Sequence, residues 1–314
     1  MEGIADHVAG CLQLAILLEV SAPKPGNVNL AAHFPNTRYE HFLASAVAVE
    51  PSFREAAIQG MKYQEKKIEP SQTSLGRIIR TAIVRVNTWQ RGGNTLLGAM
   101  ILLSPIAVAA GIALADRETL RLPELRANIN SVVKSTTPAD AVAFYEAINL
   151  ANPNGLVGKA PTLDVNDPES RKRIVKEGIT LYDILRISAA YDSISGELVE
   201  NYPLTFDVGY PYLSEQLRKK SNLNEAIVHT FLKVLSVKPD TLVVRKAGIK
   251  KAEEISEKAR EVLDLGGLRT NPGSRAATSL DRELRRQGNQ LNPGTTADVI
   301  SAILAVSILN GYRP

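Results

Sequence analysis

The chain has 314 residues, of which 44% are hydrophobic, and its 37 basic and 33 acidic residues leave a net charge of +4. This apolar content excludes a disordered chain, and the mild charge with only 5% aromatic residues argues against a nucleic-acid-binding protein. The single cysteine, Cys11, excludes an internal disulfide and a cysteine-rich zinc site. The first ten residues carry no basic segment, so we expect a cytoplasmic protein without a signal peptide.

Helical spacing of apolar residues dominates the chain, beginning with Ile4, Val8 and Leu12 in residues 4–18. Short segments at 132–133 and 242–244 are compatible with strands at most. Loops are spread evenly without a long linker, which favours one compact multi-helix domain over 1–314 and an all-α fold. Further helices are expected at 39–67, 75–86, 95–115, 123–134, 139–150, 171–200, 212–219, 223–237, 241–265, 274–287 and 296–309.

Residues 96–115 form a run of 20 residues without a charge, long enough to cross a bilayer. The run contains Gly98, Ser104, Pro105 and Gly111, and no aromatic belt flanks it. We therefore interpret it as a buried central helix and expect no membrane partner.

Three glycine-containing loops run into predicted helices: Lys24-Pro25-Gly26-Asn27, Arg91-Gly92-Gly93-Asn94 and Asn292-Pro293-Gly294-Thr295-Thr296. The first turn of a helix presents unpaired N–H groups and a partial positive charge, and glycine lets a ligand approach the backbone. Together these loops predict a cradle for a phosphate chain, whereas each one alone is equally typical of ordinary turns and caps. Neither a Walker A loop nor a Rossmann glycine motif is present.

Asp298 has two readings. As the acid three residues after Thr295, it completes a capping-box pattern at the start of a helix. Alternatively, it holds Mg²⁺ beside a bound phosphate through its carboxylate oxygens.

The predicted helix 171–200 carries Ser188, Asp192 and Ser195 on one polar stripe, either as a solvated face or as part of a site. Asp183 points nearly opposite to Asp192 on a straight helix, so the two should not share a site.

Asp240 precedes the adjacent cations Arg245 and Lys246. The segment is either a helix N-cap followed by a solvated charged face, or a place where Arg245 or Lys246 reaches phosphate.

Taken together, the chain resembles the triphosphoribosyl-dephospho-CoA synthase family. The matching segments run in family order: LLEVSAPKPGNV (17–28), VNTWQRGGNTLLGAMILLSP (86–105), DAVAFYEAINLANPNGLV (140–157), YDSISGELVENY (191–202), PDTLVVRKAG (239–248) and LNPGTTADV (291–299).

The resemblance implies an all-helical enzyme in which the 2′-hydroxyl of dephospho-CoA attacks the anomeric carbon of ATP and adenine leaves. Such chemistry needs clamps for a triphosphate, Mg²⁺ as the expected cofactor, and a carboxylate near the hydroxyl or the anomeric carbon. As catalytic candidates we take Glu19, Asp192 and Glu197, and as metal ligands Asp298 and Asp192. The predicted nucleotide-binding set is Lys24, Gly26, Asn27, Asn87, Arg91, Gly92, Gly93, Asn94, Asp240, Arg245, Lys246, Asn292, Gly294, Thr295 and Thr296.

The chain also departs from the family pattern. The stretch from Asn87 to Asn94 has no histidine, where citrate-lyase-type members carry one, and the ending NPGTTAD replaces a Gly-Ser type. These departures indicate a divergent branch, so the acceptor is dephospho-CoA or a related alcohol. Two alternatives remain at this point: a hydrolase of N-glycosidic bonds in nucleotides, and a non-catalytic helical nucleotide-binding protein.

Overall fold

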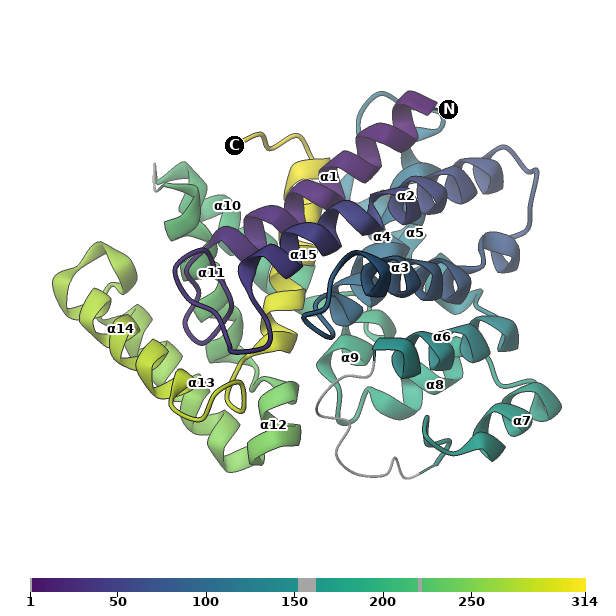
Figure 1. The fold of residues 1–314 in the computed structure, drawn as a ribbon. Helices are drawn as coiled ribbons and strands as arrows, with labels where there is room; N and C mark the ends of the chain where they lie inside the picture. Colours follow the sequence, from purple (N-terminus) through teal and green to yellow (C-terminus); the bar gives the residue numbers. More distant parts are fainter. Residues whose placement is uncertain (1, 152–161, 220–221) are drawn as a thin grey trace.

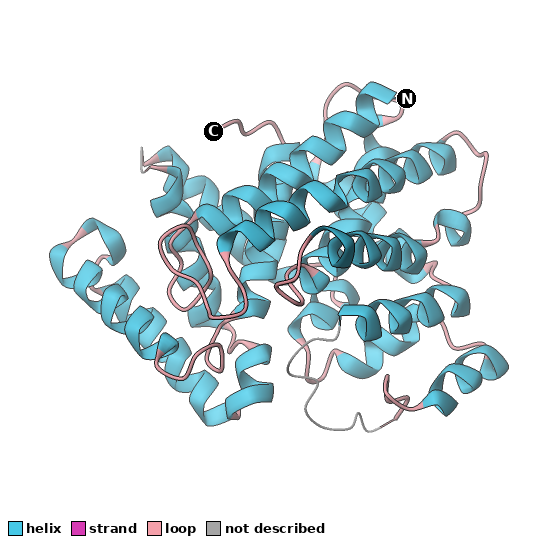
Figure 2. Ribbon diagram, viewed as in Figure 1, coloured by secondary structure: helices cyan, strands magenta, loops and turns pink. Residues whose placement is uncertain are grey.

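The computed structural model describes residues 2–151, 162–219 and 222–314, so most of the predicted loop at 151–155 lies outside the described residues. Helices make up nearly all of the regular structure, and no strand occurs within these ranges, as Figure 2 shows. Two isolated bridges, Asn29–Ala32 and Phe34–Thr37, lie in the loop after the first helix. The prediction of an all-α fold is confirmed. The α-helices are α1 (Glu2–Ser21), α2 (Tyr39–Gln64), α3 (Leu75–Trp89), α4 (Leu97–Leu114), α5 (Leu122–Lys134), α6 (Pro138–Ala151), α7 (Pro168–Glu177), α8 (Leu181–Ser188), α9 (Ser193–Val199), α10 (Tyr210–Arg218), α11 (Leu223–Val237), α12 (Thr241–Ala247), α13 (Ile249–Asp264), α14 (Asn271–Arg285) and α15 (Gly294–Leu309), with shorter turns η1 (Pro70–Thr73), η2 (Leu204–Gly209) and η3 (Gly267–Arg269).

Helix α4 is the centre of the molecule, with α1, α2, α3, α5 and α15 packed against it (Figure 1). Every residue of α4 except Gly98 is buried, which explains why its sequence has no polar face. By length and hydropathy α1 and α4 could each cross a bilayer, but 94% of the α4 window is buried inside the protein. The prediction of a buried central helix is confirmed.

Two glycines bring α2 and α4 into close contact. A Cβ atom added at Gly60 would lie 2.0 Å from the carbonyl oxygen of Val108, and one added at Gly111 would lie 2.2 Å from that of Ala57. Because no real side chain tolerates such distances, glycine at both positions is required for this helix crossing.

The single helix predicted for 171–200 was wrong, since the structure has α7, α8 and α9 there. Gly178 ends α7 in the left-handed conformation with φ 69°, and Thr180 and Asp183 form a reciprocal capping box that starts α8. Asp192 then caps α9. Gly178, Thr180 and Asp192 are of residue types that favour helix ends. The apolar periodicity that runs through the segment nevertheless predicted one continuous helix.

The prediction for 241–265 was wrong in the same way. Gly248 adopts φ 86° between α12 and α13, a conformation that helix residues do not adopt. The segments at 132–133 and 242–244, considered as possible strand pieces, are helical.

Candidate active site

Three loops that are far apart in the sequence line one cavity of about 500 Å³. We call residues 22–38 loop 1, residues 90–96 loop 2 and residues 286–293 loop 3. Loop 1 contributes Asn27, loop 2 contributes Gly92 to Leu96, and loop 3 contributes Asn289 and Asn292, followed by the first residues of α15. The cavity volume lies in the range typical of small-molecule sites.

Loop 1 is attached to α14 by backbone contacts at Gly26. Its N–H donates to Asp281 Oδ1 at 2.8 Å, and the carbonyl oxygen of the next residue, Asn27, accepts from Arg285. Gly26 has φ 74°, and a Cβ there would lie 2.8 Å from Leu284 and 3.1 Å from Pro293. Only glycine at position 26 therefore allows loop 1 to pack this closely against loop 3. Gly26 itself is not among the residues that line the cavity.

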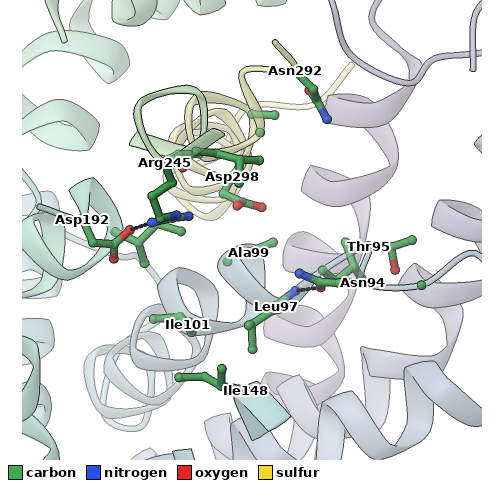
Figure 3. A pocket seen from close by; sticks show the side chains of 18 of the residues that line it. Asn94, Thr95, Leu97, Ala99, Ile101, Ile148, Asp192, Arg245, Asn292 and Asp298 are labelled. Carbon is green, nitrogen blue, oxygen red and sulfur yellow. Dashed lines mark hydrogen bonds and ion pairs between the residues drawn. The ribbon is translucent and has the colours of Figure 1, made fainter. Parts of the chain in front are cut away.

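Loop 2 is fixed from two sides. Thr37 Oγ1 donates to the carbonyl oxygen of Gly92 at 2.8 Å, and the hydroxyls of Ser45 and Thr95 lie 2.7 Å apart. Asn94 Oδ1 accepts from the backbone N–H of Leu97 at 3.0 Å, so loop 2 also satisfies the first turn of α4 (Figure 3).

Lys24 does not face the cavity, contrary to the prediction that it binds phosphate. Its side chain is fully buried, and its ammonium donates to the carbonyl oxygens of Glu19 and Ala22 and lies 2.9 Å from Glu19 Oε1. The Glu19 carbonyl belongs to the last turn of α1 and Ala22 directly follows the helix, a place where a cation is favourable. Glu19, in turn, lines the cavity, and burial raises the pKa of its carboxyl while Lys24 opposes that rise.

Asp298 lines the cavity and does not cap its own helix. Helix α15 begins at Gly294, two residues earlier than expected, so Asp298 lies beyond the capping position and the capping-box interpretation was wrong. The carboxylate instead approaches the start of α4, where the N–H of Ala99 donates to it. A Cβ added at Gly98 would lie 2.0 Å from Asp298 Oδ2, so glycine leaves space for this carboxylate.

The environment of Asp298 favours its neutral form. Desolvation raises the pKa of this carboxyl well above its usual value, and the nearby carboxylates of Glu19, Asp240 and Asp192 raise it further. The helix N–H of Ala99 acts in the opposite direction. A cation bound beside this carboxyl would lower its pKa again.

Arg245 and Asp192 form an ion pair at the cavity wall, with Nη1 and Oδ1 3.0 Å apart (Figure 3). The other oxygen of Asp192 accepts from the N–H and hydroxyl of Ser195, at 3.0 Å and 2.8 Å. Ser188 Oγ donates to Ser195 Oγ at 2.8 Å, so the expected trio is assembled, although across a helix break and not along one helix. Asp183 caps α8 and is absent from the cavity lining, as predicted.

Lys246 also lines the cavity, and its ammonium donates to the carbonyl oxygen of Asn289 in loop 3 at 3.0 Å. Partial burial lowers the pKa of this lysine. The contact ties α12 to loop 3 and leaves further donors of the ammonium for a ligand.

Asp240 is a structural residue behind the cavity, not one of its lining groups. One carboxylate oxygen accepts from the N–H groups of Leu242 and Val243, and the other accepts from the N–H and hydroxyl of Thr296. Asp240 thus joins the starts of α12 and α15, which carry Arg245 and Thr295. The predicted nucleotide-binding roles of Asp240 and Thr296 are replaced by this positioning role.

Glu197 is also outside the cavity. Its carboxylate accepts from the N–H of Leu204 at 2.7 Å and from the N–H and hydroxyl of Thr205 at 3.0 Å and 2.6 Å. These bonds hold the start of η2, and burial raises the pKa of Glu197 to about 7. The structure therefore contradicts its predicted catalytic placement.

Asn87 near the end of α3 and Arg91 in loop 2 are both exposed on the surface. Asn87 Nδ2 donates to the carbonyl oxygen of Leu150 at 2.7 Å, and Arg91 Nη1 donates to that of Asn87 at 2.7 Å. Both are satisfied by backbone groups outside the cavity lining, so their predicted nucleotide contacts are not supported. The predicted residues that do line the cavity are Glu19, Asn27, Gly92, Gly93, Asn94, Asp192, Arg245, Lys246, Asn292, Gly294, Thr295 and Asp298.

Sequence reasoning missed the apolar part of the cavity. Its side chains come from α4, α6, α8 and α9 on one side, and from loop 1 and α2 on the other. Nothing in their spacing separates them from ordinary core residues, whereas Gly98 at the start of an uncharged helix was a usable signal. The missed residues include Phe34, Phe42, Ile101, Phe144, Tyr145, Ile148, Ile184 and Ile194.

The charges at the cavity do not suit a bare polyanion. Among the described residues, its lining holds four carboxylates but only two cations, Arg245 and Lys246. A triphosphate would need additional positive charge here, and divalent Mg²⁺ commonly supplies it through one or two carboxylates together with phosphate oxygens. No three metal-binding side chains gather anywhere in the described ranges, so these residues alone offer no closed metal cage. The carboxylates are Glu19, Asp164, Asp192 and Asp298.

The fold defines an all-helical protein. Its cavity combines apolar walls with charged groups that suit a polyanion bound together with a cation. The family that matches is described as ATP:dephospho-CoA triphosphoribosyl transferase, and the match covers residues 5–314. The chain belongs to this family, which confirms the resemblance seen in its motifs.

Similar proteins agree with this assignment. A protein of Pseudomonas savastanoi pv. phaseolicola, described as a probable 2-(5''-triphosphoribosyl)-3'-dephosphocoenzyme-A synthase, is 22% identical over 99% of this chain and 93% of its own length. A protein of Pseudomonas syringae pv. tomato with the same description is 24% identical, with the same coverage. A crystal structure from Archaeoglobus fulgidus, described as a "putative triphosphoribosyl-dephospho-coA synthase", has a TM-score of 0.62 at 23% identity and covers 86% of this chain and 100% of its own. That likeness shows a shared fold.

Proposed function

We propose that the protein transfers the 5-triphosphoribosyl group of ATP to the 2′-hydroxyl of dephospho-CoA, with release of adenine. The observation that carries this proposal is the meeting of loops 1, 2 and 3 around one cavity that combines Arg245 and Lys246 with the carboxylates of Glu19 and Asp298. Family membership supports the same reaction.

The phosphate end of ATP is best accommodated by α12 and the start of α15. Arg245 and Lys246 lie within one turn of α12, and Gly294 and Thr295 open α15, whose first N–H groups carry partial positive charge. Arg245 is held by Asp192, which fixes the guanidinium before a ligand arrives.

Mg²⁺ is the expected companion of the triphosphate, and Asp298 is the carboxylate that would hold it. Asn292 supports this fit, because its Oδ1 atom is buried without a hydrogen-bond partner at the same cavity. Bound there, the ion would neutralise phosphate charge that the two cations leave uncompensated.

The displacement itself requires a proton acceptor near the attacking hydroxyl. In the reaction the acceptor oxygen forms a bond to C1′, the C1′–N9 bond breaks, and adenine takes its electron pair. Glu19 is the better candidate to receive the hydroxyl proton, because Lys24 balances its charge from behind the cavity. Asp192 is less suited, since both of its oxygens are already engaged by Arg245 and Ser195.

The proposed activity is tested by following adenine release from ATP and Mg²⁺ with and without dephospho-CoA. We expect release that depends on the acceptor, together with a product carrying the mass of the triphosphoribosyl group. Adenine release at the same rate without an acceptor would instead identify a hydrolase. ATP binding without any adenine release would identify a non-catalytic nucleotide-binding protein.

A further inference from the structure

The apolar side chains that line the cavity fall into two groups, which belong to different clusters of buried residues. The first, which we call the α6 lobe, lies where α4, α6, α8 and α9 meet, and Figure 3 shows Ile101 and Ile148 on the side of the cavity away from Asn292. The second, the loop-1 lobe, is formed by Val20, Val28, Phe34 and Phe42. The α6 lobe consists of Ile101, Phe144, Ile148, Leu163, Ile184 and Ile194.

The α6 lobe offers an apolar surface with polar groups at its rim. The hydroxyl of Tyr145 donates to the carbonyl oxygen of Leu163 at 2.5 Å, which closes one wall of the lobe. Ser188, Ser195, Asn166 and the carboxylate of Asp164 line the same cavity from neighbouring positions. Apolar walls with a few polar groups are typical of small-molecule sites, and such walls suit the uncharged ring of a nucleobase.

A nucleoside triphosphate has a matching polarity. Its charged phosphates lie at one end and its uncharged base at the other, with the ribose between them. In Figure 3 Arg245 and Asp298 lie together above the middle of the view, whereas Ile101 and Ile148 lie below it. A nucleotide with its phosphates near Arg245 would therefore direct its base toward the α6 lobe.

The geometry of the displacement indicates which of the two lobes receives the leaving base. In a direct displacement at an anomeric carbon, the nucleophile attacks on the face opposite to the leaving group. Glu19, the proposed proton acceptor, directly precedes Val20 of the loop-1 lobe in α1, so we place the attacking hydroxyl beside that lobe. In Figure 1 loop 1 lies on the left of the view and α6 on the right, so the leaving base faces the α6 lobe.

The loop-1 lobe is the poorer place for the leaving base for a second reason. The guanidinium of Arg285 lies over the ring of Phe34, 5.5 Å from its centroid, and occupies one face of that ring. A base that stacks on Phe34 would have to share the ring with this cation.

Building on the proposed function, we propose that the α6 lobe is the binding site for the nucleobase of the donor nucleotide, the base that leaves as adenine. The lobe thereby determines which nucleotide the enzyme accepts. The phosphate end makes no distinction between bases, so selection falls to Phe144, Ile148 and the polar rim.

The test separates the two ends of the nucleotide with two probes, adenosine and inorganic tripolyphosphate with Mg²⁺, whose binding is measured by titration. Ile148→Trp fills the α6 lobe from a partly exposed position, and Phe42→Trp adds the same ring to the loop-1 lobe as the matched control. We expect Ile148→Trp to weaken adenosine binding by about tenfold or more while tripolyphosphate binding stays within about twofold. Phe42→Trp should leave both probes unchanged.

Three results would overturn the assignment: unchanged adenosine binding in Ile148→Trp, loss of adenosine binding in Phe42→Trp alone, or no adenosine binding by the parent protein. If Ile148→Trp does not fold by circular dichroism, Phe144→Leu replaces it and should weaken adenosine binding by about threefold or more through loss of the ring. Failure of the proposed function gives a different signature, namely adenosine binding at the α6 lobe with no adenine release from ATP and dephospho-CoA.

Discussion

The ammonium of Lys24 lies 2.9 Å from Glu19 Oε1, and the lysine has no exposed surface. The loop that carries Lys24 folds back onto the end of α1, so a residue that looked like a phosphate ligand instead supports a carboxylate at the cavity. This relationship changes the expected behaviour of variants at Lys24 from a binding defect to a stability defect.

Lys24→Met should lower the free energy of unfolding by about 3 kcal/mol, because it leaves Glu19 buried without its counter-ion. Urea unfolding followed by circular dichroism measures the loss. The double variant Lys24→Met/Glu19→Gln serves as the control and should recover part of it, since no buried charge remains unpaired. Stability equal to that of the parent in the single variant would show that the pair contributes nothing.

Arg245→Ala should weaken ATP binding by about tenfold to a hundredfold, which corresponds to losing a charge-assisted hydrogen bond of about 1.5–3 kcal/mol. Arg91→Ala is the matched control, because Arg91 lies outside the cavity lining and donates to the backbone of Asn87. Calorimetric titration with ATP and Mg²⁺ compares the two. Equal losses in both variants would contradict the assignment of phosphate binding to α12.

Asp298→Asn should reduce the dependence of ATP binding on Mg²⁺, because the amide keeps the shape of the side chain but removes its charge. ATP affinity is measured across a series of Mg²⁺ concentrations, with an expected loss of about tenfold at saturating metal. Asp183→Asn, at the capping box of α8 and outside the cavity lining, is the control and should keep the full dependence. An unchanged Mg²⁺ response in Asp298→Asn would remove this residue from the metal site.

Glu197 predicts a specific dependence of stability on pH. Its pKa is raised to about 7 in the folded protein from an ordinary value of 4.5, so the folded state binds the proton more tightly. The contribution is therefore fully present below about pH 4.5 and is lost as the pH rises through about 7, by about 3 kcal/mol in total.

Urea unfolding of the parent and of Glu197→Gln at pH 5, 6, 7 and 8 measures this contribution. The stability of the variant relative to the parent should rise across the series, because glutamine does not ionise. The difference isolates Glu197, since Asp298, Glu19 and Asp240 titrate in both proteins. A constant difference from pH 5 to 8 would show that Glu197 does not titrate there.

Local sequence patterns were sufficient for the helical fold, the central helix α4 and the three loops that meet at the cavity. Each of these depends on interactions between neighbours in the chain: apolar periodicity, an uninterrupted uncharged run, and glycine at a turn. Dependence on local patterns also explains why the helix ends at Gly178, Asp192 and Gly248 were not predicted. At each of these residues a long apolar pattern outweighed a short helix-ending signal.

The tertiary structure alone decided which polar residues face the cavity. Lys24 and Asp298 both lie in glycine-containing motifs, yet Lys24 is turned toward the end of α1 and Asp298 toward the start of α4. The sequence shows which charged groups are present. The partner of each group is set by the packing of helices that are distant in the sequence. A buried charge must find such a partner because desolvation is costly, and its position in the chain does not reveal which one it finds.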